Sequence, residues 1–167
     1  MPRSIPRAAL LIFVLGSAVG AAPAVRAGLQ AAPAADWRDW PATQGTWAYR
    51  QDARGSIALF GRYGEPADLT IRCDRGRGQV YLSRRGEPPA DAEASLTIRT
   101  TSTTRSFAAL PTGGTPAYLA IALGVRDPIL DAMGYSRGRF TVEAAGLPTL
   151  VVPAWAEILR VTEDCRA

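Results

Sequence analysis

The chain has 167 residues and a formal net charge of +4, from 19 arginines set against 15 acidic residues, and it contains neither histidine nor lysine. Without these two residue types it lacks the commonest general base and metal ligand, and it has no lysine for a Schiff base or a Walker-type phosphate loop. Two cysteines are too few for the usual zinc site. We therefore expect no catalytic residue, no metal and no cofactor.

Residues 1–27 are expected to be a signal peptide for export. Two arginines give a positive start, and residues 8–19 form an apolar run of the length that such a peptide needs. Residues 25–27 (Val-Arg-Ala) offer a cleavage site before Gly28, and residues 22–24 offer a second one. The apolar run is shorter than the roughly 20 residues that span a bilayer, so we expect cleavage and not a membrane anchor.

Loss of the signal peptide changes the charge of the chain. The remaining 140 residues carry 16 arginines and 15 acidic residues, a net charge near +1. This charge is too small for a nucleic-acid partner bound by electrostatics, and no later segment is apolar enough to span a membrane. We expect a periplasmic or secreted monomer, with a disordered lead-in over residues 28–35 and a single β-rich domain over residues 36–167.

Three of the four tryptophans lie in the segment 36–49 that opens this domain. Trp37 and Trp40, beside Pro41, could form an aromatic surface for a glycan or a partner protein. The alternative, which we favour, is that they hold the N-terminal segment over a sheet.

Short strands separated by turn residues are predicted over most of the domain. The predicted antiparallel pairs are 47–50 with 56–60, 69–73 with 79–83, 95–101 with 104–110, and 140–143 with 147–152. The glycine-rich turn 74–78 makes the second pair the clearest hairpin. Residues 118–125 fit either a strand or a short helix, and periodicity does not decide between the two.

Two short helices are expected in the C-terminal part. Asp127 and Pro128 are a typical helix start, an N-cap followed by proline, and they predict a helix that ends near Tyr135. A last helix is predicted to begin at Pro153. Its expected inner stripe comprises Trp155, Ile158, Leu159, Thr162 and Cys165. The elements together predict a mainly β fold, an antiparallel β-sandwich or half-barrel with one or two short helices, including a C-terminal helix.

The two cysteines are expected to form one disulfide. Alternation in the strand 69–73 places Cys73 on its apolar face, and Cys165 lies on the inner stripe of the last helix. An exported chain with two cysteines most simply holds one bridge between them. A redox-active pair is not favoured, because the Cys-x-x-Cys spacing is absent.

The stretch from Arg99 to Arg105 is unusual, because it places five hydroxyl residues between two arginines. Arg99, Ser102 and Arg105 could hydrogen-bond a sugar or clamp an anionic group. The alternative, which we favour, is a solvated hairpin tip with β-branched flanks. These three residues, with Trp37 and Trp40, are the candidate contacts of a ligand or partner.

Paired carboxylates are the one catalytic chemistry that the composition leaves open, as in a glycosidase. Asp127 and Asp131 lie four residues apart, but Asp127 is explained as a helix cap. Glu163 and Asp164 lie close to two arginines in the last helix. None of the four lies in a sequence context typical of a catalytic acid.

The C-terminal third has a recurring shape, in which residues 130–133 are followed by strands at 140–143 and 150–153 and by a helix that ends at Cys165. Over about 35 residues this pattern resembles the end of small exported proteobacterial proteins of the invasion-associated locus B type. It is also similar to the periplasmic type VI secretion accessory proteins of the VasI kind. The resemblance implies an exported accessory protein, and the composition suits a high-GC bacterium such as a sphingomonad.

We therefore expect an exported, non-enzymatic binding or envelope-accessory module that contacts an unknown envelope component or protein. A second hypothesis is an inhibitor of an envelope hydrolase such as lysozyme, which would insert the loop from Arg99 to Arg105 into the target's cleft. A third is a carboxylate-based enzyme that acts on a glycan, and it requires two carboxylates facing one cleft.

Overall fold

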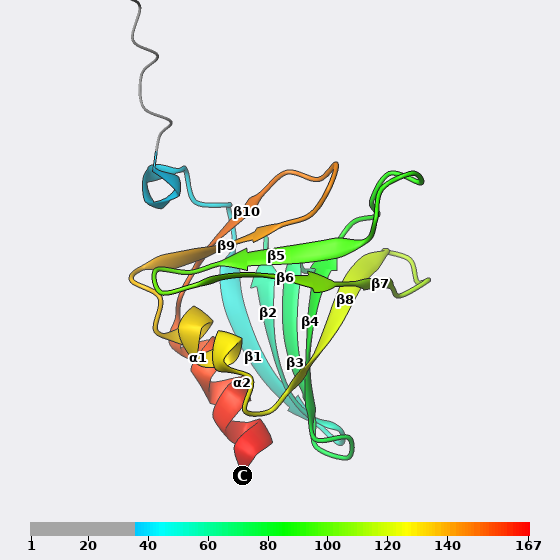
Figure 1. The fold of residues 1–167 in the computed structure, drawn as a ribbon. Helices are drawn as coiled ribbons and strands as arrows, with labels where there is room; N and C mark the ends of the chain where they lie inside the picture. Colours follow the sequence, from blue (N-terminus) through cyan, green and yellow to red (C-terminus); the bar gives the residue numbers. More distant parts are fainter. Residues whose placement is uncertain (1–35) are drawn as a thin grey trace, which may run out of the picture. The chain divides into compact units, whose positions relative to one another are not determined.

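The computed structural model describes residues 36–167, which form two antiparallel sheets and two α-helices (Figure 1). The mainly β fold with a C-terminal helix is therefore confirmed. The signal peptide expected over 1–27 and the lead-in expected over 28–35 lie outside the described residues.

The larger sheet has six strands in the order β1-β2-β3-β4-β8-β7. They are β1 (Thr46–Asp52), β2 (Gly55–Gly61), β3 (Leu69–Asp74), β4 (Gln79–Arg85), β7 (Leu110–Pro111) and β8 (Tyr118–Gly124). The first two predicted hairpins are present as β1–β2 and β3–β4. Residues 118–124, which periodicity left undecided, form a strand that pairs with β4 along its whole length.

The smaller sheet has four strands in the order β10-β9-β5-β6. They are β5 (Ser95–Arg99), β6 (Thr104–Ala108), β9 (Arg139–Glu143) and β10 (Leu150–Pro153). The strand predicted over 104–110 is divided between the two sheets, because the chain leaves β6 at Ala109 and pairs with β8 at Leu110. Ala109 is buried at this crossing, and its N–H donates to the carbonyl oxygen of Ala94 at 2.8 Å.

Buried apolar side chains of both sheets form one core. The alternation predicted for β3 is confirmed, since Leu69, Ile71 and Cys73 are fully buried and the residues between them are partly exposed. The smaller sheet contributes Ile98 of β5 and Phe140 of β9, both also fully buried. The two inner faces therefore shield each other's apolar surface, which is the arrangement of a β-sandwich.

The helix α1 (Pro128–Gly134) begins where the sequence predicts it, with the Asp127 carboxylate accepting the N–H of Ile129 at 3.0 Å. The second helix, α2 (Ala156–Arg166), packs against α1 and against β1, β2 and β3 (Figure 1). The prediction that Pro153 opens α2 is wrong, because Pro153 ends β10 and pairs with Arg139. Since β10 lies at the edge of its sheet, a proline without an N–H is tolerated there.

The later start of α2 also changes its inner stripe. Trp155 was expected on that stripe, but it precedes the helix and is 47% exposed. Ile158 and Thr162 are buried as predicted, and Val161 is buried beside them. The first helical turn therefore begins after Trp155 and does not carry its side chain inward.

The segment before β1 lies on the edge of the smaller sheet. It begins with a 3-10 helix, η1 (Trp37–Asp39), in which the ring of Trp37 is buried. Thr43 exchanges two hydrogen bonds with Val151 of β10, both 2.9 Å long. Arg139 donates from Nη1 to the carbonyl oxygen of Trp40 at 2.6 Å. The segment therefore has the strap arrangement that the sequence analysis favoured over an open aromatic surface.

Candidate functional site

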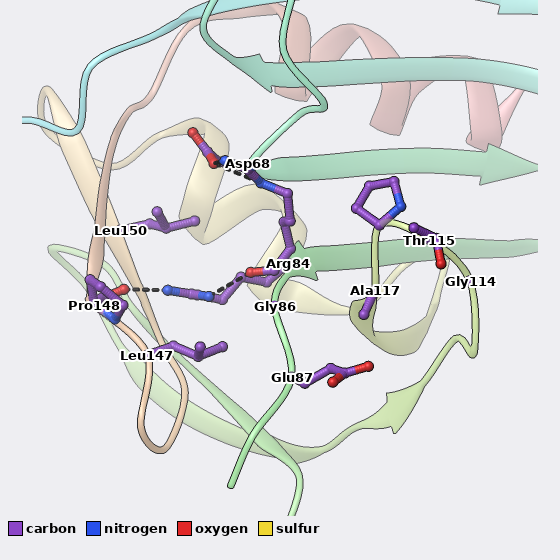
Figure 2. Close-up of a pocket in the computed structure, with 12 residues that line it drawn as sticks. Asp68, Arg84, Gly86, Glu87, Gly114, Thr115, Ala117, Leu147, Pro148 and Leu150 are labelled. Carbon is purple, nitrogen blue, oxygen red and sulfur yellow. Dashed lines mark hydrogen bonds and ion pairs between the residues drawn. The ribbon is translucent and has the colours of Figure 1, made fainter.

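A hollow of about 660 Å³ lies where β4 ends, and we refer to it as the Arg84 cleft (Figure 2). Three connections supply most of its walls. They are residues 84–87 at the end of β4, residues 114–117 before β8, and residues 147, 148 and 150 at the start of β10. A volume of this size is within the range of small-molecule binding sites.

Arg84 occupies a position on β4 that the alternation assigns to the core. Val80 and Leu82 are fully buried on the same face, and Arg84 is only 3% exposed. Burial lowers the pKa of its guanidinium, because removal from water disfavours the charged form. An arginine nevertheless stays protonated in proteins, so the cleft contains a buried positive charge.

The guanidinium of Arg84 donates to two backbone carbonyl oxygens, those of Arg85 at 2.8 Å and of Pro148 (Figure 2). Its Nε is buried and has no hydrogen-bond partner. Asp68 also lines the cleft, but its carboxylate pairs with Arg85. Within residues 36–167 no carboxylate forms an ion pair with Arg84.

Gly86 brings two walls of the cleft close together. Its φ is +128°, and its N–H donates to the carbonyl oxygen of Ala117 at 2.9 Å. A Cβ at this position would lie 2.7 Å from a methyl carbon of Leu147. The positive φ favours glycine at this position, and any larger residue would also require the side chain of Leu147 to shift.

The two arginines that flank the β5–β6 turn are both engaged within the chain. Arg99 pairs with Glu143 of β9 at 3.2 Å. Arg105 pairs with Asp127 at 2.5 Å, and its guanidinium lies 4.6 Å from the ring centroid of Phe107. Arg99 therefore links β5 to β9, and Arg105 links β6 to the start of α1.

Ser102 is exposed at the tip of the same turn, where it lines a second hollow of about 480 Å³. We refer to it as the Tyr135 hollow, and its other lining residues are Arg38, Thr101, Tyr135 and Arg137. Trp37 does not line it, but its ring lies 5.0 Å below the guanidinium of Arg38. Of the five candidate contacts, which all lie within the described residues, Ser102 is the one that lines either of these two hollows.

Sequence reasoning missed Arg84, Tyr135 and Arg137. A signal for Arg84 was present, because it continues the alternation of Val80 and Leu82 one residue beyond the strand predicted over 79–83. Tyr135 was predicted only as the end of a helix, and no contact with a ligand was predicted for Arg137. The local sequence pattern does not indicate that Tyr135 and Arg137 line the same hollow as Ser102.

Three of the four carboxylates considered for catalysis, Asp127, Asp131 and Asp164, are engaged in contacts that stabilise the fold. Asp131 accepts two hydrogen bonds from Arg166, at 2.8 and 3.0 Å. Asp164 accepts one from the hydroxyl of Tyr49 at 2.5 Å. Among the described residues, no group of three or more His, Cys, Asp or Glu side chains could hold a metal ion.

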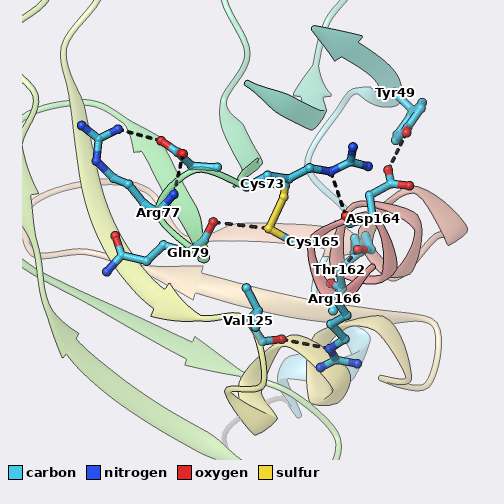
Figure 3. The surroundings of a disulfide bond; sticks show 12 residues. Tyr49, Cys73, Arg77, Gln79, Val125, Thr162, Asp164, Cys165 and Arg166 are labelled. Atoms are coloured by element: carbon cyan, nitrogen blue, oxygen red, sulfur yellow. Dashed lines mark hydrogen bonds and ion pairs between the residues drawn. A yellow bond between two sulfur atoms is a disulfide. The ribbon is translucent and has the colours of Figure 1, made fainter. Parts of the chain in front are cut away.

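The expected disulfide joins Cys73 of β3 to Cys165 of α2, which are 92 positions apart in the sequence, with an S–S distance of 2.06 Å (Figure 3). The same end of α2 is held by Arg166, whose Nε donates to the carbonyl oxygen of Val125 at 2.9 Å. In residues 36–167, no helix is both long enough and apolar enough to cross a membrane.

Comparison of the chain with protein-family models, with curated proteins and with solved structures finds no match. Functional inference therefore starts from the chemistry of the two hollows. The Arg84 cleft is the larger of them.

Proposed function

We propose that the chain is an exported, non-enzymatic binding module of the bacterial envelope, and that the Arg84 cleft binds an acidic group of its ligand. The observation that carries this proposal is the buried guanidinium of Arg84, which has no carboxylate partner among the described residues. The negative charge of Asp68 raises the pKa of Arg84, but that carboxylate is paired with Arg85. A buried charge without a directly paired counter-charge is costly. A ligand carboxylate or phosphate would supply that charge, and both groups match the donors of a guanidinium.

The size and the apolar walls of the cleft fit a ligand larger than an isolated anion. Its volume of about 660 Å³ exceeds what a single carboxylate needs, and Leu147, Leu150 and Pro116 give it apolar surface. Such a combination of apolar walls and a few polar groups is typical of ligand sites. The ligand is therefore an envelope component that carries an acidic group on a larger, partly apolar body.

Export and accessory function are supported by independent features. A disulfide persists in an oxidising compartment such as the periplasm. The signal-peptide pattern of residues 1–27 agrees with that location. The resemblance to exported accessory proteins of the invasion-associated locus B type fits a role in binding and not in catalysis.

A chemical-shift titration of residues 28–167 with acetate and inorganic phosphate tests the proposal. We expect saturable shifts of amides that line the cleft, such as those of Gly86 and Ala117. Thr115 is exposed at the rim, and Thr115→Glu places a competing carboxylate there, so the affinity should fall at least about tenfold.

Thr112→Glu is the matched control, because Thr112 is exposed in the same connection but does not line the cleft. This variant should bind both probes like the unsubstituted protein. The proposal fails if neither anion shifts the cleft amides, or if the two glutamate variants weaken binding equally.

A further inference from the structure

The Tyr135 hollow is assembled from three segments that are far apart in the sequence. Arg38 comes from η1, Thr101 and Ser102 come from the β5–β6 turn, and Tyr135 and Arg137 come from the connection between α1 and β9. Figure 1 shows the β5–β6 turn beside the start of β9. The hollow shares no lining residue with the Arg84 cleft, so it is a separate site.

Hydrogen bonds between these segments fix the walls of the hollow. The N–H of Thr101 donates to the hydroxyl of Ser136 at 3.1 Å, and the N–H of Arg137 donates to the hydroxyl of Thr101 at 3.2 Å. Within the turn, the buried hydroxyl of Thr100 accepts the N–H of Thr103 at 3.0 Å. A site whose walls are already ordered loses little conformational entropy when a ligand binds.

The hollow presents positive charge without a lining carboxylate. Arg137 is exposed, and its side chain forms no ion pair within the part of the chain that the structure describes. Arg38 is held in place by the ring of Trp37 and by its pair with Asp36 at 3.0 Å. Arg137 is therefore the guanidinium that is available to a ligand's acidic group.

An exposed aromatic ring stands next to these charges. Tyr135 is 70% exposed, although a large ring of this kind usually buries more of its surface. The hydroxyls of Thr101 and Ser102 line the same hollow, whose volume is about 480 Å³. A flat apolar ring, several hydroxyls and a cation are together the groups that recognise a sugar ring with a carboxylate.

We infer that the Tyr135 hollow binds a sugar that carries a carboxylate, separately from any ligand of the Arg84 cleft. Arg137 binds the carboxylate, the hydroxyl of Ser102 hydrogen-bonds the hydroxyls of the sugar, and the ring of Tyr135 packs on its apolar face. The sugar can be a uronic acid or an N-acetylmuramic acid residue, since both place a carboxylate on or next to the ring.

Isothermal titration calorimetry of residues 28–167 with glucuronic acid and with N-acetylmuramic acid tests this inference. At least one of the two should bind, and the neutral counterparts, glucose and N-acetylglucosamine, should bind at least about tenfold more weakly. Which acid binds identifies the source of the ligand, and either result supports the inference.

Paired variants assign the binding to the hollow. Arg137→Met should weaken binding of the acidic sugar at least about tenfold, whereas Arg126→Met, at another exposed arginine, should not. Tyr135→Ala should weaken binding, whereas Tyr63→Ala removes an even more exposed ring elsewhere and should have no effect. Thr115→Glu should also leave the affinity unchanged, so that failure of the Arg84 proposal does not affect this test.

Several results would overturn the inference. They are no binding of either acid, equal binding of the neutral sugars, and equal effects of the matched variants. Inhibition of lysozyme by the protein, lost in both Arg137→Met and Tyr135→Ala, would instead assign this surface to a protein partner and would also overturn it.

Discussion

At the residue scale, Asp164 shows how opposing effects set the properties of one side chain. Partial burial raises the pKa of its carboxyl, whereas the hydrogen bond from Tyr49 and the positive charges of Arg75 and Arg160 lower it. The lowering effects are larger together, so the pKa of Asp164 lies below its usual value. The ionised carboxylate therefore helps to hold α2 against β1.

This depressed pKa predicts a pH dependence of stability. Because the carboxyl is more acidic in the folded chain than in the unfolded chain, its contribution is present above about pH 4 and is lost as the pH falls through the folded pKa. In Asp164→Asn, the unfolding free energy from urea titrations should therefore be lower at pH 7 and should fall less steeply below about pH 5.

Asp91→Asn is the control for this prediction, because Asp91 is an exposed carboxylate. It should reproduce the pH profile of the unsubstituted protein. An Asp164→Asn profile parallel to that of the unsubstituted protein would show that Asp164 contributes no pH-dependent stability.

Only part of the candidate site could be predicted from single residues. Alternation on β4 marks Arg84 as an arginine at an inward position, but not what it contacts. Asp68 is close enough to line the same cleft, yet it pairs with Arg85, the next residue along β4. Which of the two consecutive arginines forms an ion pair with Asp68 depends on the direction of each side chain in the assembled sheet.

At the element scale, local patterns predicted the strands and hairpins better than the boundaries between elements. Hairpins follow from alternation and turn residues that are adjacent in the sequence. The apolar pattern around Ala109 continues without a break, although the chain changes sheets there. Pro153 is compatible with both a helix start and an edge strand, and only the pairing of β10 with β9 decides between them.

The attachment of α2 to β3 through the disulfide carries a prediction of stability. The bridge joins residues 92 positions apart. Closure of a loop of this length lowers the entropy of the unfolded chain and so stabilises the folded state by about 4–5 kcal/mol. The double variant Cys73→Ala/Cys165→Ala should lose stability by about that amount in urea titrations at pH 7.

Reduction provides the control for the disulfide. The unsubstituted protein should lose a similar amount of stability in reducing buffer, and the double variant should not respond to the reductant. A change below about 1 kcal/mol in the double variant would show that the bridge adds little to the packing of α2.

At the scale of the described domain, the sequence predicted the class of fold. It did not predict which strands pair across long stretches of sequence or which connecting segments lie side by side. The smaller sheet needs β5 to pair with β9, and about 40 residues separate these strands. The walls of the Arg84 cleft likewise come from connections near residues 85, 115 and 148. Such contacts follow from the order of strands, which local periodicity does not encode.

If the chain is exported as we propose, the protein in the cell envelope should have the mass of the cleaved, disulfide-bonded form. Protein isolated from a periplasmic extract should begin at Gly28 and should lack the two thiol hydrogens, because Cys73 and Cys165 are joined. Intact mass spectrometry with and without reduction and alkylation measures both features. A full-length chain with two free thiols would contradict export.

The most direct test of the binding proposal is a crystal structure of residues 28–167 soaked with 3-bromobenzoate, a carboxylate whose bromine is located by anomalous scattering. We predict that the bromine lies in the Arg84 cleft with the carboxylate within hydrogen-bond distance of the Arg84 guanidinium, and that crystals of Thr115→Glu lack it. A cleft that stays empty at a saturating concentration, or bromine only at other sites, would contradict the binding proposal.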